Sequence, residues 1–329
     1  MMHKRYNIPS QEGLTDAQKK WMDLKFGIRI TFGINTFYNA ELSNGSLDPS
    51  IITLDELDIN EWVNTAINAG MRYCVFTAKS HDGFCNWNTK YSYYNIMNTP
   101  FNKDILLILA EACAQSGLKL GIYYSLQDHY ISYYNNDKKF AEYVYLQLEE
   151  LMNNYGEVVE LWLDGFWEKQ SSGWNLAPSD FIHAWRSDGA FRYKIDYLYR
   201  SIKMWQPDCI LLNHSTIDFV GIPLHPVDAR VGVNVSYVVV DKKYWDWLGK
   251  ESYFPLEITM NLSGKDNGKF NPGNWFWKEE DETVPEKERI YRWLDLADRH
   301  ESNLVLNCSV SPAGKLRQVD KLLLDDLWH

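Results

Sequence analysis

The sequence predicts one α/β domain built as a (β/α)8 barrel. Short segments rich in β-branched and aromatic residues alternate with longer segments whose apolar residues have helical spacing, which is the pattern of a parallel sheet covered by helices. About eight strand-like segments can be distinguished, the number that closes such a barrel. Because neither a repeat nor a linker divides the sequence, we expect a single domain over residues 1–329.

The expected strands and helices alternate along the chain. The first four strands are the apolar runs at residues 28–33, 73–77, 118–124 and 158–163, and helical spacing follows the first three at residues 54–69, 103–116 and 140–154. The other strands are expected at residues 209–213, 231–240, 257–262 and 303–307, and the other helices at residues 193–205 and 286–298. Residues 169–190, rich in Ser, Gly and Asp, and residues 265–274 are expected to be long loops at one end of the barrel.

Several predicted strands end in side chains that are common in active sites. These are Lys79, Ser80, His81 and Asp82 after the second strand, Ser125, Asp128 and His129 after the third, Asp164 after the fourth, and Asn213 and His214 after the fifth. The carboxyl ends of barrel strands converge on one face, where the active sites of such enzymes lie. The sequence therefore predicts an enzyme active site there.

Composition and charge limit the classes of partner. The sequence is 45% hydrophobic and 23% charged, as in ordinary folded proteins. Its net charge of −11 disfavours nucleic acid and anionic membranes as partners. The N-terminus lacks the apolar run of a signal peptide, so the default expectation is the cytoplasm; a leader removed earlier would indicate the periplasm or secretion.

No cofactor and no metal are expected. The five cysteines are an odd number and form neither a Cys-x-x-Cys pair nor a zinc-type spacing with histidine, so we expect them to be reduced and mostly buried. The sequence also lacks a P-loop, a dinucleotide-binding glycine motif, a serine-hydrolase elbow and a zinc-protease motif.

Aromatic residues make up 15% of the sequence, with 14 Trp and 21 Tyr, and many stand next to polar residues. Aromatic rings stack on the C–H faces of sugars, so this excess is compatible with a carbohydrate ligand. The alternative is that these rings fill the core of a large barrel.

The segment Glu160-Leu161-Trp162-Leu163-Asp164-Gly165 gives the sharpest local prediction. An apolar strand places a carboxylate at its last position, and the following glycine lets the backbone turn away from a substrate. In a glycosidase such a carboxylate attacks the anomeric carbon while a second carboxylic acid protonates the leaving oxygen. The alternative role for Asp164 is a helix N-cap.

Residues 79–87 give the second prediction. His81 can donate to sugar hydroxyls, Lys79 can support a nearby carboxylate, and aromatic residues such as Trp87 can line a pocket. The alternative is a structural role, because Asp-Gly is a frequent turn and most histidines are structural.

Motifs along almost the whole chain resemble the α-L-fucosidases of glycoside hydrolase family 29. In order, they are Lys25-Phe26-Gly27, Ala69-Gly70-Met71-Arg72-Tyr73, residues 79–87, Thr99-Pro100-Phe101, residues 117–125, residues 161–165, Gln206-Pro207-Asp208, Pro255-Leu256-Glu257 and residues 303–307. The resemblance implies a (β/α)8 catalytic domain, hydrolysis of terminal α-L-fucosyl residues with retention, no metal, and Asp164 as nucleophile. We expect the family's usual C-terminal β-sandwich to be absent.

The chain departs from the family pattern at two positions expected to hold the sugar. Thr31-Phe32-Gly33 stands where the family has His-Trp-Gly, and Ser80 precedes His81 where the family has two histidines. A short hydroxyl changes reach and hydrogen bonding, so a related L-sugar such as L-galactose is the second expected substrate. We expect the sugar of an oligosaccharide or glycoconjugate to be bound by Thr31, Lys79, Ser80, His81, Trp87, Tyr124, Asn213, Glu257 and Trp275.

The acid/base residue is predicted less directly, because the family varies there. Asp241 ends the predicted sixth strand and is the first candidate, ahead of Asp228, Glu251 and Glu257. In a subgroup of the family the acid ends an arginine-led motif, and the comparable stretch here, residues 230–235, has valine at that place. The prediction is thus a retaining exo-α-L-glycosidase, and the alternative is a catalytically inactive sugar-binding barrel.

Overall fold

A computed structural model of the chain describes residues 14–165, 194–213, 227–233, 244–247, 250–253, 255–264 and 274–329. Parallel strands close into a barrel in the order β1-β10-β9-β6-β5-β4-β3-β2, and β1 pairs with β2 to complete the ring. The barrel strands are β1 Phe26–Thr31, β2 Tyr73–Lys79, β3 Lys119–Ser125, β4 Val158–Asp164, β5 Ile210–Asn213, β6 Ala229–Val233, β9 Leu256–Asn261 and β10 Asn303–Ser309. The predicted (β/α)8 fold is confirmed.

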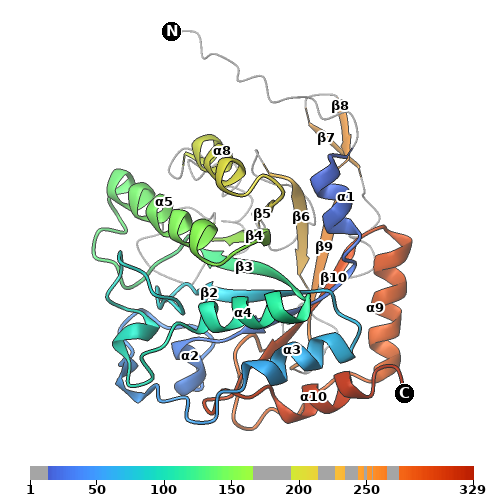
Figure 1. Ribbon diagram of the computed structural model, residues 1–329, viewed down its shortest axis with the longest axis horizontal. Helices are drawn as coiled ribbons and strands as arrows, with labels where there is room; N and C mark the ends of the chain where they lie inside the picture. Colours follow the sequence, from blue (N-terminus) through green and yellow to red (C-terminus); the bar gives the residue numbers. More distant parts are fainter. Residues whose placement is uncertain are drawn as a thin grey trace, which may run out of the picture.

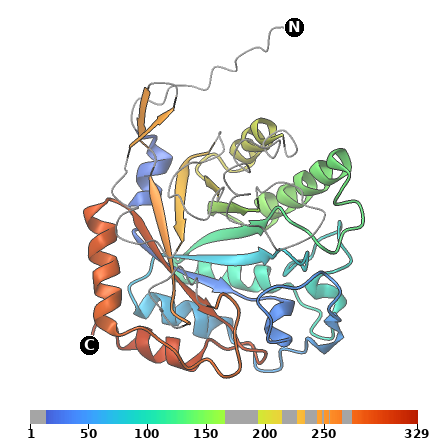
Figure 2. The same cartoon turned by 180° about the vertical axis from the view of Figure 1, so that it is seen from behind.

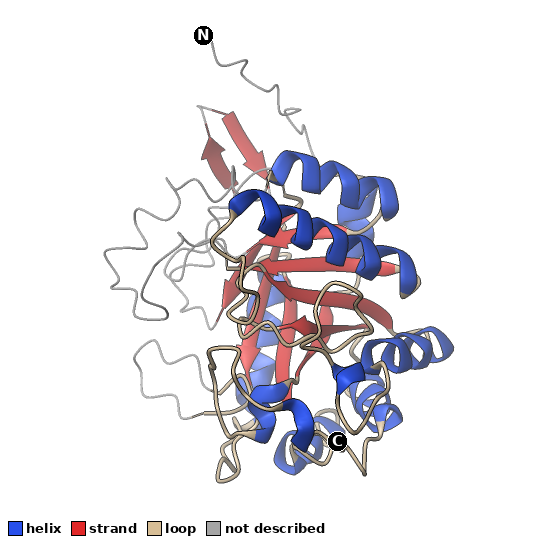
Figure 3. Ribbon diagram, turned by 90° about the vertical axis from the view of Figure 1, so that its left-hand side faces the viewer, coloured by secondary structure: helices blue, strands red, loops and turns tan. Residues whose placement is uncertain are grey.

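Helices surround this ring of strands (Figures 1 and 2). They are α1 Asp16–Met22, α2 Ile34–Phe37, α3 Ile59–Asn68, α4 Ile105–Ser116, α5 Asp137–Asn154, α8 Ile195–Trp205, α9 Lys287–Arg299 and α10 Gln318–Asp325, with short 3-10 turns η1 Pro49–Ile51 and η2 Ile96–Asn98. Helices α3 and α4 pack on β2, and α9 packs on β10. Figure 3 shows the helices outside the strands, which is why the strands are apolar on both faces.

The predicted helices were found with small differences at their starts. The side chain of Asp58 accepts a hydrogen bond from the backbone N–H of Glu61 and so starts α3 later than predicted. Asn136 caps α5 in the same way and starts it earlier than predicted. Helices α1 and α10 were not predicted, because each is short; α1 depends on a capping box between Thr15 and Gln18.

Some sequence-based expectations lie outside the described residues. Predicted strand residues 234–240 and most of the two predicted loops, residues 169–190 and 265–273, belong to this group. An antiparallel hairpin of β7 Tyr244–Trp247 and β8 Lys250–Tyr253, which the sequence did not predict, lies between β6 and β9 in the chain. Among the described helices, none is both long and apolar enough to cross a membrane.

Side chains alternate between the interior of the barrel and the layer under the helices. On β3, Tyr123 belongs to the interior cluster, whereas its neighbours Ile122 and Tyr124 pack in the outer cluster. On β1, the apolar Ile28 and Ile30 face outward. All five cysteines are buried and free, as predicted: Cys74, Cys85, Cys113, Cys209 and Cys308.

The amino end of the barrel is closed by side chains. Trp21 of α1 is 2% exposed and donates its indole N–H to Glu160 at 2.7 Å. Tyr73 donates its hydroxyl to Glu257 at 2.9 Å in the same region. Gly27 is needed here, because a Cβ at that position would lie 2.7 Å from the Tyr73 ring. The closed amino end leaves the carboxyl end as the face where a ligand can approach the interior.

Candidate active site

Asp164 is the last residue of β4 and lies at the carboxyl end of the barrel. Its side chain is 11% exposed. Oδ2 accepts a hydrogen bond from the Tyr123 hydroxyl at 2.6 Å, and Oδ1 accepts one from the backbone N–H of Gly165 at 2.7 Å. Burial and the nearby Asp164 raise the pKa of Tyr123 well above its usual value, so the hydroxyl keeps its proton and remains a donor.

The glycine after Asp164 is required by the turn. Gly165 has a φ of 85°, in the left-handed region that favours glycine. A Cβ there would lie 3.0 Å from Cγ and 3.1 Å from the backbone N of Gln127. Packing against the segment after β3 therefore explains this glycine and fixes the direction of the Asp164 carboxylate.

The imidazole of His81 lies close to Asp164. Its Nε2 lies 3.7 Å from Asp164 Oδ2, and its Nδ1 lies 2.6 Å from the Ser125 hydroxyl oxygen. Burial lowers the pKa of His81 to about 4, against the attraction of Asp164, so the ring is neutral at physiological pH. When Ser125 donates to Nδ1, the proton is on Nε2 and can be donated to a sugar hydroxyl.

Lys79 and Asp128 form a fully buried ion pair behind this histidine. Lys79 Nζ lies 3.1 Å from Asp128 Oδ2, and both side chains have zero exposure. The register shift near the end of β2 turns Lys79 outward, where its ammonium lies over the rings of Tyr124 and Tyr143. Lys79 therefore pairs with a carboxylate, that of Asp128, as predicted. The outward position of the Lys79 side chain does not fit direct contact with substrate.

Asp82 lies beside this pair. It accepts hydrogen bonds from the Asn35 side chain at 2.9 Å and from the Phe84 backbone at 2.7 Å. Burial raises the pKa of Asp82 to about 7, with a further increase from Asp128. Gly83 completes the turn, since a Cβ there would lie 2.2 Å from Asp128 Oδ1. The residues after β2 therefore form a rigid frame that holds His81.

Thr31 and Trp275 also lie at this end. The Thr31 hydroxyl donates to Asn307 Oδ1 at 2.5 Å, and Asn307 donates to the backbone carbonyl of Trp275 at 3.3 Å. Trp275 in turn donates its backbone N–H to Glu41 Oε2 at 3.0 Å. Glu41, whose pKa is raised by burial, was missed because no strand pattern precedes it in the sequence.

Arg29 lies in the barrel interior on β1 and was also missed. It is 5% exposed, and its guanidinium carbon lies 4.0 Å from the centre of the Tyr123 ring, 4.6 Å from that of Trp162 and 4.8 Å from that of Trp275. Arg29 stands two residues before Thr31 on the same strand, and residues two apart on a strand point to the same face. This spacing could have indicated that Arg29 points into the barrel.

Two predicted sugar-binding residues point away from the barrel interior. Tyr124 has no exposed surface and donates its hydroxyl to Gln147 of α5 at 2.7 Å. Trp87 is fully buried and donates to Glu150 of the same helix at 3.3 Å. These placements do not fit contact with a sugar, and Tyr123 instead contacts Asp164.

Two predicted acidic residues lie at the amino end. Glu257 is the second residue of β9 and lies near Glu160 of β4. Glu160 stands four residues before Asp164 on the same strand, which corresponds to about 13 Å along the strand. Asp228 precedes β6 and binds Lys203 at 2.7 Å and the Leu211 N–H at 2.8 Å. Neither position fits the roles in sugar binding or proton donation considered from the sequence, because a retaining glycosidase needs carboxyls about 5–5.5 Å apart.

Other predicted residues are placed only in part. Asp241 lies outside the described residues, and of Glu251 only the backbone position in β8 is described. Asn213 ends β5 in register with Leu163 and is 3% exposed, and Ser80 directly after β2 is 7% exposed. Both are near the carboxyl ends of their strands, as predicted.

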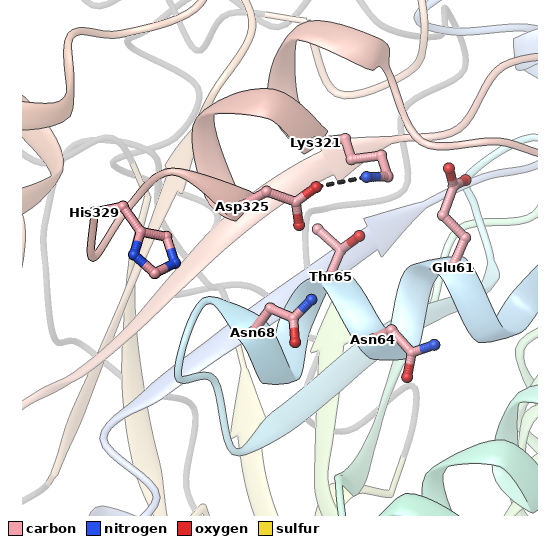
Figure 4. Close-up of a pocket in the computed structure, with 7 residues that line it drawn as sticks. All are labelled: Glu61, Asn64, Thr65, Asn68, Lys321, Asp325 and His329. Carbon is pink, nitrogen blue, oxygen red and sulfur yellow. Dashed lines mark hydrogen bonds and ion pairs between the residues drawn. The ribbon is translucent and has the colours of Figure 1, made fainter.

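A surface pocket of about 540 Å³ lies elsewhere, between α3 and α10. Figure 4 shows its lining: Glu61, Asn64, Thr65, Asn68, Lys321, Asp325 and His329. Lys321 and Asp325 form an ion pair within it. Since the pocket is outside the helical layer, it is separate from Asp164. Within the described ranges, no group of three or more His, Cys, Asp or Glu side chains is arranged to hold a metal ion.

Comparison with known proteins decides the family of this barrel. A family model described as α-L-fucosidase matches residues 50–210. The α-L-fucosidase 1 of Arabidopsis thaliana is 34% identical over 330 residues, which cover 95% of this chain and 59% of the plant protein. The chain belongs to the α-L-fucosidase family, glycoside hydrolase family 29. The tissue α-L-fucosidase of Rattus norvegicus is 32% identical over 38% of this chain and 28% of its own length.

Solved structures share the fold of this family member. A glycoside hydrolase 29 family member from an unknown rumen bacterium superposes with a TM-score of 0.76 at 24% identity, covering 95% of this chain and 56% of that one. The α-L-fucosidase AlfC of Lactobacillus casei, in complex with α-L-fucose product, gives 0.70 at 20% identity, covering 95% and 97%. The chain thus spans 59% of the plant relative and nearly the whole of AlfC.

Proposed function

We propose that this protein is a retaining α-L-fucosidase-like hydrolase in which Asp164 is the nucleophile. The observation that carries the proposal is the position of Asp164 at the carboxyl end of β4, partly exposed and held by Tyr123 and Gly165. The names of the relatives support the substrate class, and AlfC holds α-L-fucose as its product.

The reaction has two steps. An Asp164 carboxylate oxygen attacks the anomeric carbon, the bond to the leaving oxygen breaks, and an acid group gives that oxygen its proton. Water then attacks the same carbon, the conjugate base takes its proton, and the ester bond to Asp164 breaks. The two inversions give a sugar of retained configuration. The position of His81, neutral and 3.7 Å from Asp164, supports a role in donating to a hydroxyl of the bound sugar.

For the acid/base we retain Asp241 as the first candidate from the sequence. Asp228 and Glu257 are poor alternatives because they lie at the amino end. Glu41 is a described carboxyl at the carboxyl end of the barrel, so Glu41→Gln is compared with Asp241→Ala in the mutational test.

The sugar itself is an α-L-fucoside first and an α-L-galactoside second. The observation that favours the second is the pair of short hydroxyl side chains, Thr31 and Ser80, where the family has histidine. L-Galactose carries a hydroxyl at C6 that L-fucose lacks, and buried polar groups discriminate strongly between such sugars.

The test uses 4-nitrophenyl α-L-fucoside, α-L-galactoside and β-D-galactoside with the wild type, Asp164→Asn, Asp241→Ala and Glu41→Gln. We expect Asp164→Asn to lose at least about 10³-fold in kcat, with partial rescue by azide, because the covalent route is removed. Asp241→Ala should impair natural glycosides far more than aryl glycosides with good leaving groups. Near-wild-type activity of Asp164→Asn would contradict the proposal, and no hydrolysis of any glycoside by the wild type would favour the inactive sugar-binding barrel.

A further inference from the structure

Arg29 places a positive charge in the interior of the barrel, next to the tyrosine that holds the proposed nucleophile. It is the fourth residue of β1, points inward, and is 5% exposed. The rings of Tyr123, Trp162 and Trp275 lie within 4.8 Å of its guanidinium carbon. No ion pair joins Arg29 to a carboxylate of the described residues. A buried cation enclosed by rings interacts over longer distances than one in water, because little solvent screens it.

Tyr123 connects this cation to Asp164. The guanidinium lies over its ring at 4.0 Å, and the Tyr123 hydroxyl donates to Asp164 Oδ2 at 2.6 Å. A cation over the ring makes the hydroxyl a stronger donor, and a hydrogen bond to the charged form of a carboxyl favours that form. Arg29 and Tyr123 thus act on the same oxygen of Asp164.

The other basic groups described on this side of the barrel include Lys79, His81 and Lys278, and each of these three is paired or neutral. Behind His81, Lys79 is neutralised by Asp128 at 3.1 Å, and His81 itself is neutral. At the mouth, Lys278 lies 3.6 Å from Glu41.

On the amino-end side, the only described acids near Arg29 are the buried pair Glu160 and Glu257. Burial and the charge of Glu257 raise the pKa of Glu160 well above its usual value, so the pair holds a proton. The remaining charge of the pair is stabilised by hydrogen bonds, because Tyr73 donates to Glu257 and Trp21 donates to Glu160. The remaining described anion that Arg29 can stabilise is Asp164.

We propose that Arg29 is a positioning residue that keeps the Asp164 carboxylate ionised and oriented through Tyr123. This inference rests on the proposed role of Asp164. Arg29 makes no ion pair with Asp164 itself, so it acts through the ring and hydroxyl of Tyr123. A nucleophile must be ionised to attack, so the effect of Arg29 is greatest at acidic pH.

The test compares Arg29→Met, Arg29→Lys and the control Val75→Ala in pH profiles of kcat/KM on the aryl glycoside that the wild type cleaves best. Val75 is a buried interior residue on β2, so its truncation disturbs the same core without removing charge. We expect the acidic limb of Arg29→Met to move upward by about one pH unit, with a loss of about tenfold at the acid end. Arg29→Lys keeps the positive charge, so its acidic limb should lie close to that of the wild type. Val75→Ala should leave the limb unchanged.

Two outcomes would overturn the inference. One is an unchanged acidic limb in folded Arg29→Met, and the other is an equal shift in Val75→Ala. If Arg29→Met does not fold by circular dichroism, Arg29→Gln takes its place, because it removes the charge while keeping a polar side chain, and it should shift the limb in the same direction. Failure of the proposed function is distinguished by Asp164→Asn: an active Asp164→Asn contradicts the nucleophile, whereas an inactive one with a normal Arg29→Met contradicts only this inference.

Discussion

His81 is a residue whose charge state links stability to pH. Its folded pKa of about 4 lies below the usual 6.5, so in that window the unfolded chain binds a proton that the folded protein does not. Stability from neutral His81 is therefore present above pH 6.5 and lost as the pH falls toward 4. We expect the wild type to lose on the order of 3 kcal/mol relative to His81→Gln between these pH values. Urea unfolding of both proteins at several pH values measures this, and parallel curves would contradict it.

Asp82 gives stability the opposite dependence on pH in the range from pH 4 to 6.5. The stability of the wild type must therefore be compared with that of His81→Gln at each pH. Its folded pKa of about 7 is above the usual 3.8, so its contribution falls as the pH rises. The two effects partly cancel in the wild type. The comparison with His81→Gln removes this cancellation, because Asp82 is present in both proteins.

Single site residues were predictable only where the end of a strand marked them. Asp164 stands at such an end, as predicted from the sequence, and its role as nucleophile stays a proposal. Tyr124 was named for sugar binding and Tyr123 was not considered. Alternation along a strand places one inside and the other outside, and the sequence alone does not fix which is which. The direction of Lys79 was not predictable for a related reason: a register shift near the end of β2 changes it.

At the level of elements, strands and long helices were predicted well because both faces of each strand are buried and each long helix has one apolar face. The starts of helices depended on caps such as Asp104, which accepts from the Leu107 N–H and starts α4. Short α1 was missed although it closes the barrel through Trp21. Its role depends on a tertiary contact with Glu160, and such a contact leaves no local pattern.

The turn after β4 offers a prediction at this scale. Gly165→Ala should lower the free energy of unfolding by about 1–2 kcal/mol, because a side chain at positive φ is strained. It should also lower kcat at least tenfold (~1.4 kcal/mol), since the new Cβ meets Gln127 and moves the N–H that binds Asp164. Kinetics and urea unfolding measure both effects.

Gly117→Ala is the matched control for that change. Gly117 ends α4 with a φ of 80°, and a Cβ there meets nothing within 4 Å. It should lose a similar amount of stability without loss of kcat. An equal loss of kcat in both variants would mean that the turn after β4 has no special role.

At the level of the whole molecule, the barrel separates two groups of buried acids. Asp164 lies at the open carboxyl end, and Glu160 and Glu257 lie at the end closed by α1. Barrels commonly keep chemistry at the first end and stability at the second. The sequence assigned Glu257 to sugar binding because its motif resembles the family, and only the strand register showed that it belongs to the other end.

Glu257→Gln tests this separation. Glutamine keeps the size of the side chain and an oxygen that can accept from Tyr73, and position 257 is on the order of 13 Å from Asp164. We therefore expect kcat/KM within about threefold of the wild type, which is less than ~1 kcal/mol. Burial raises the pKa of Glu257, so its contribution to stability is present at low pH and falls as the pH rises through the folded value. Glu257→Gln should accordingly gain melting temperature relative to the wild type as the pH rises from about 5 to 9. Thermal unfolding across this range and kinetics at neutral pH give the two readouts. A folded variant with a large rise in KM would return Glu257 to the sugar-binding site and contradict the assignment of the amino end to stability.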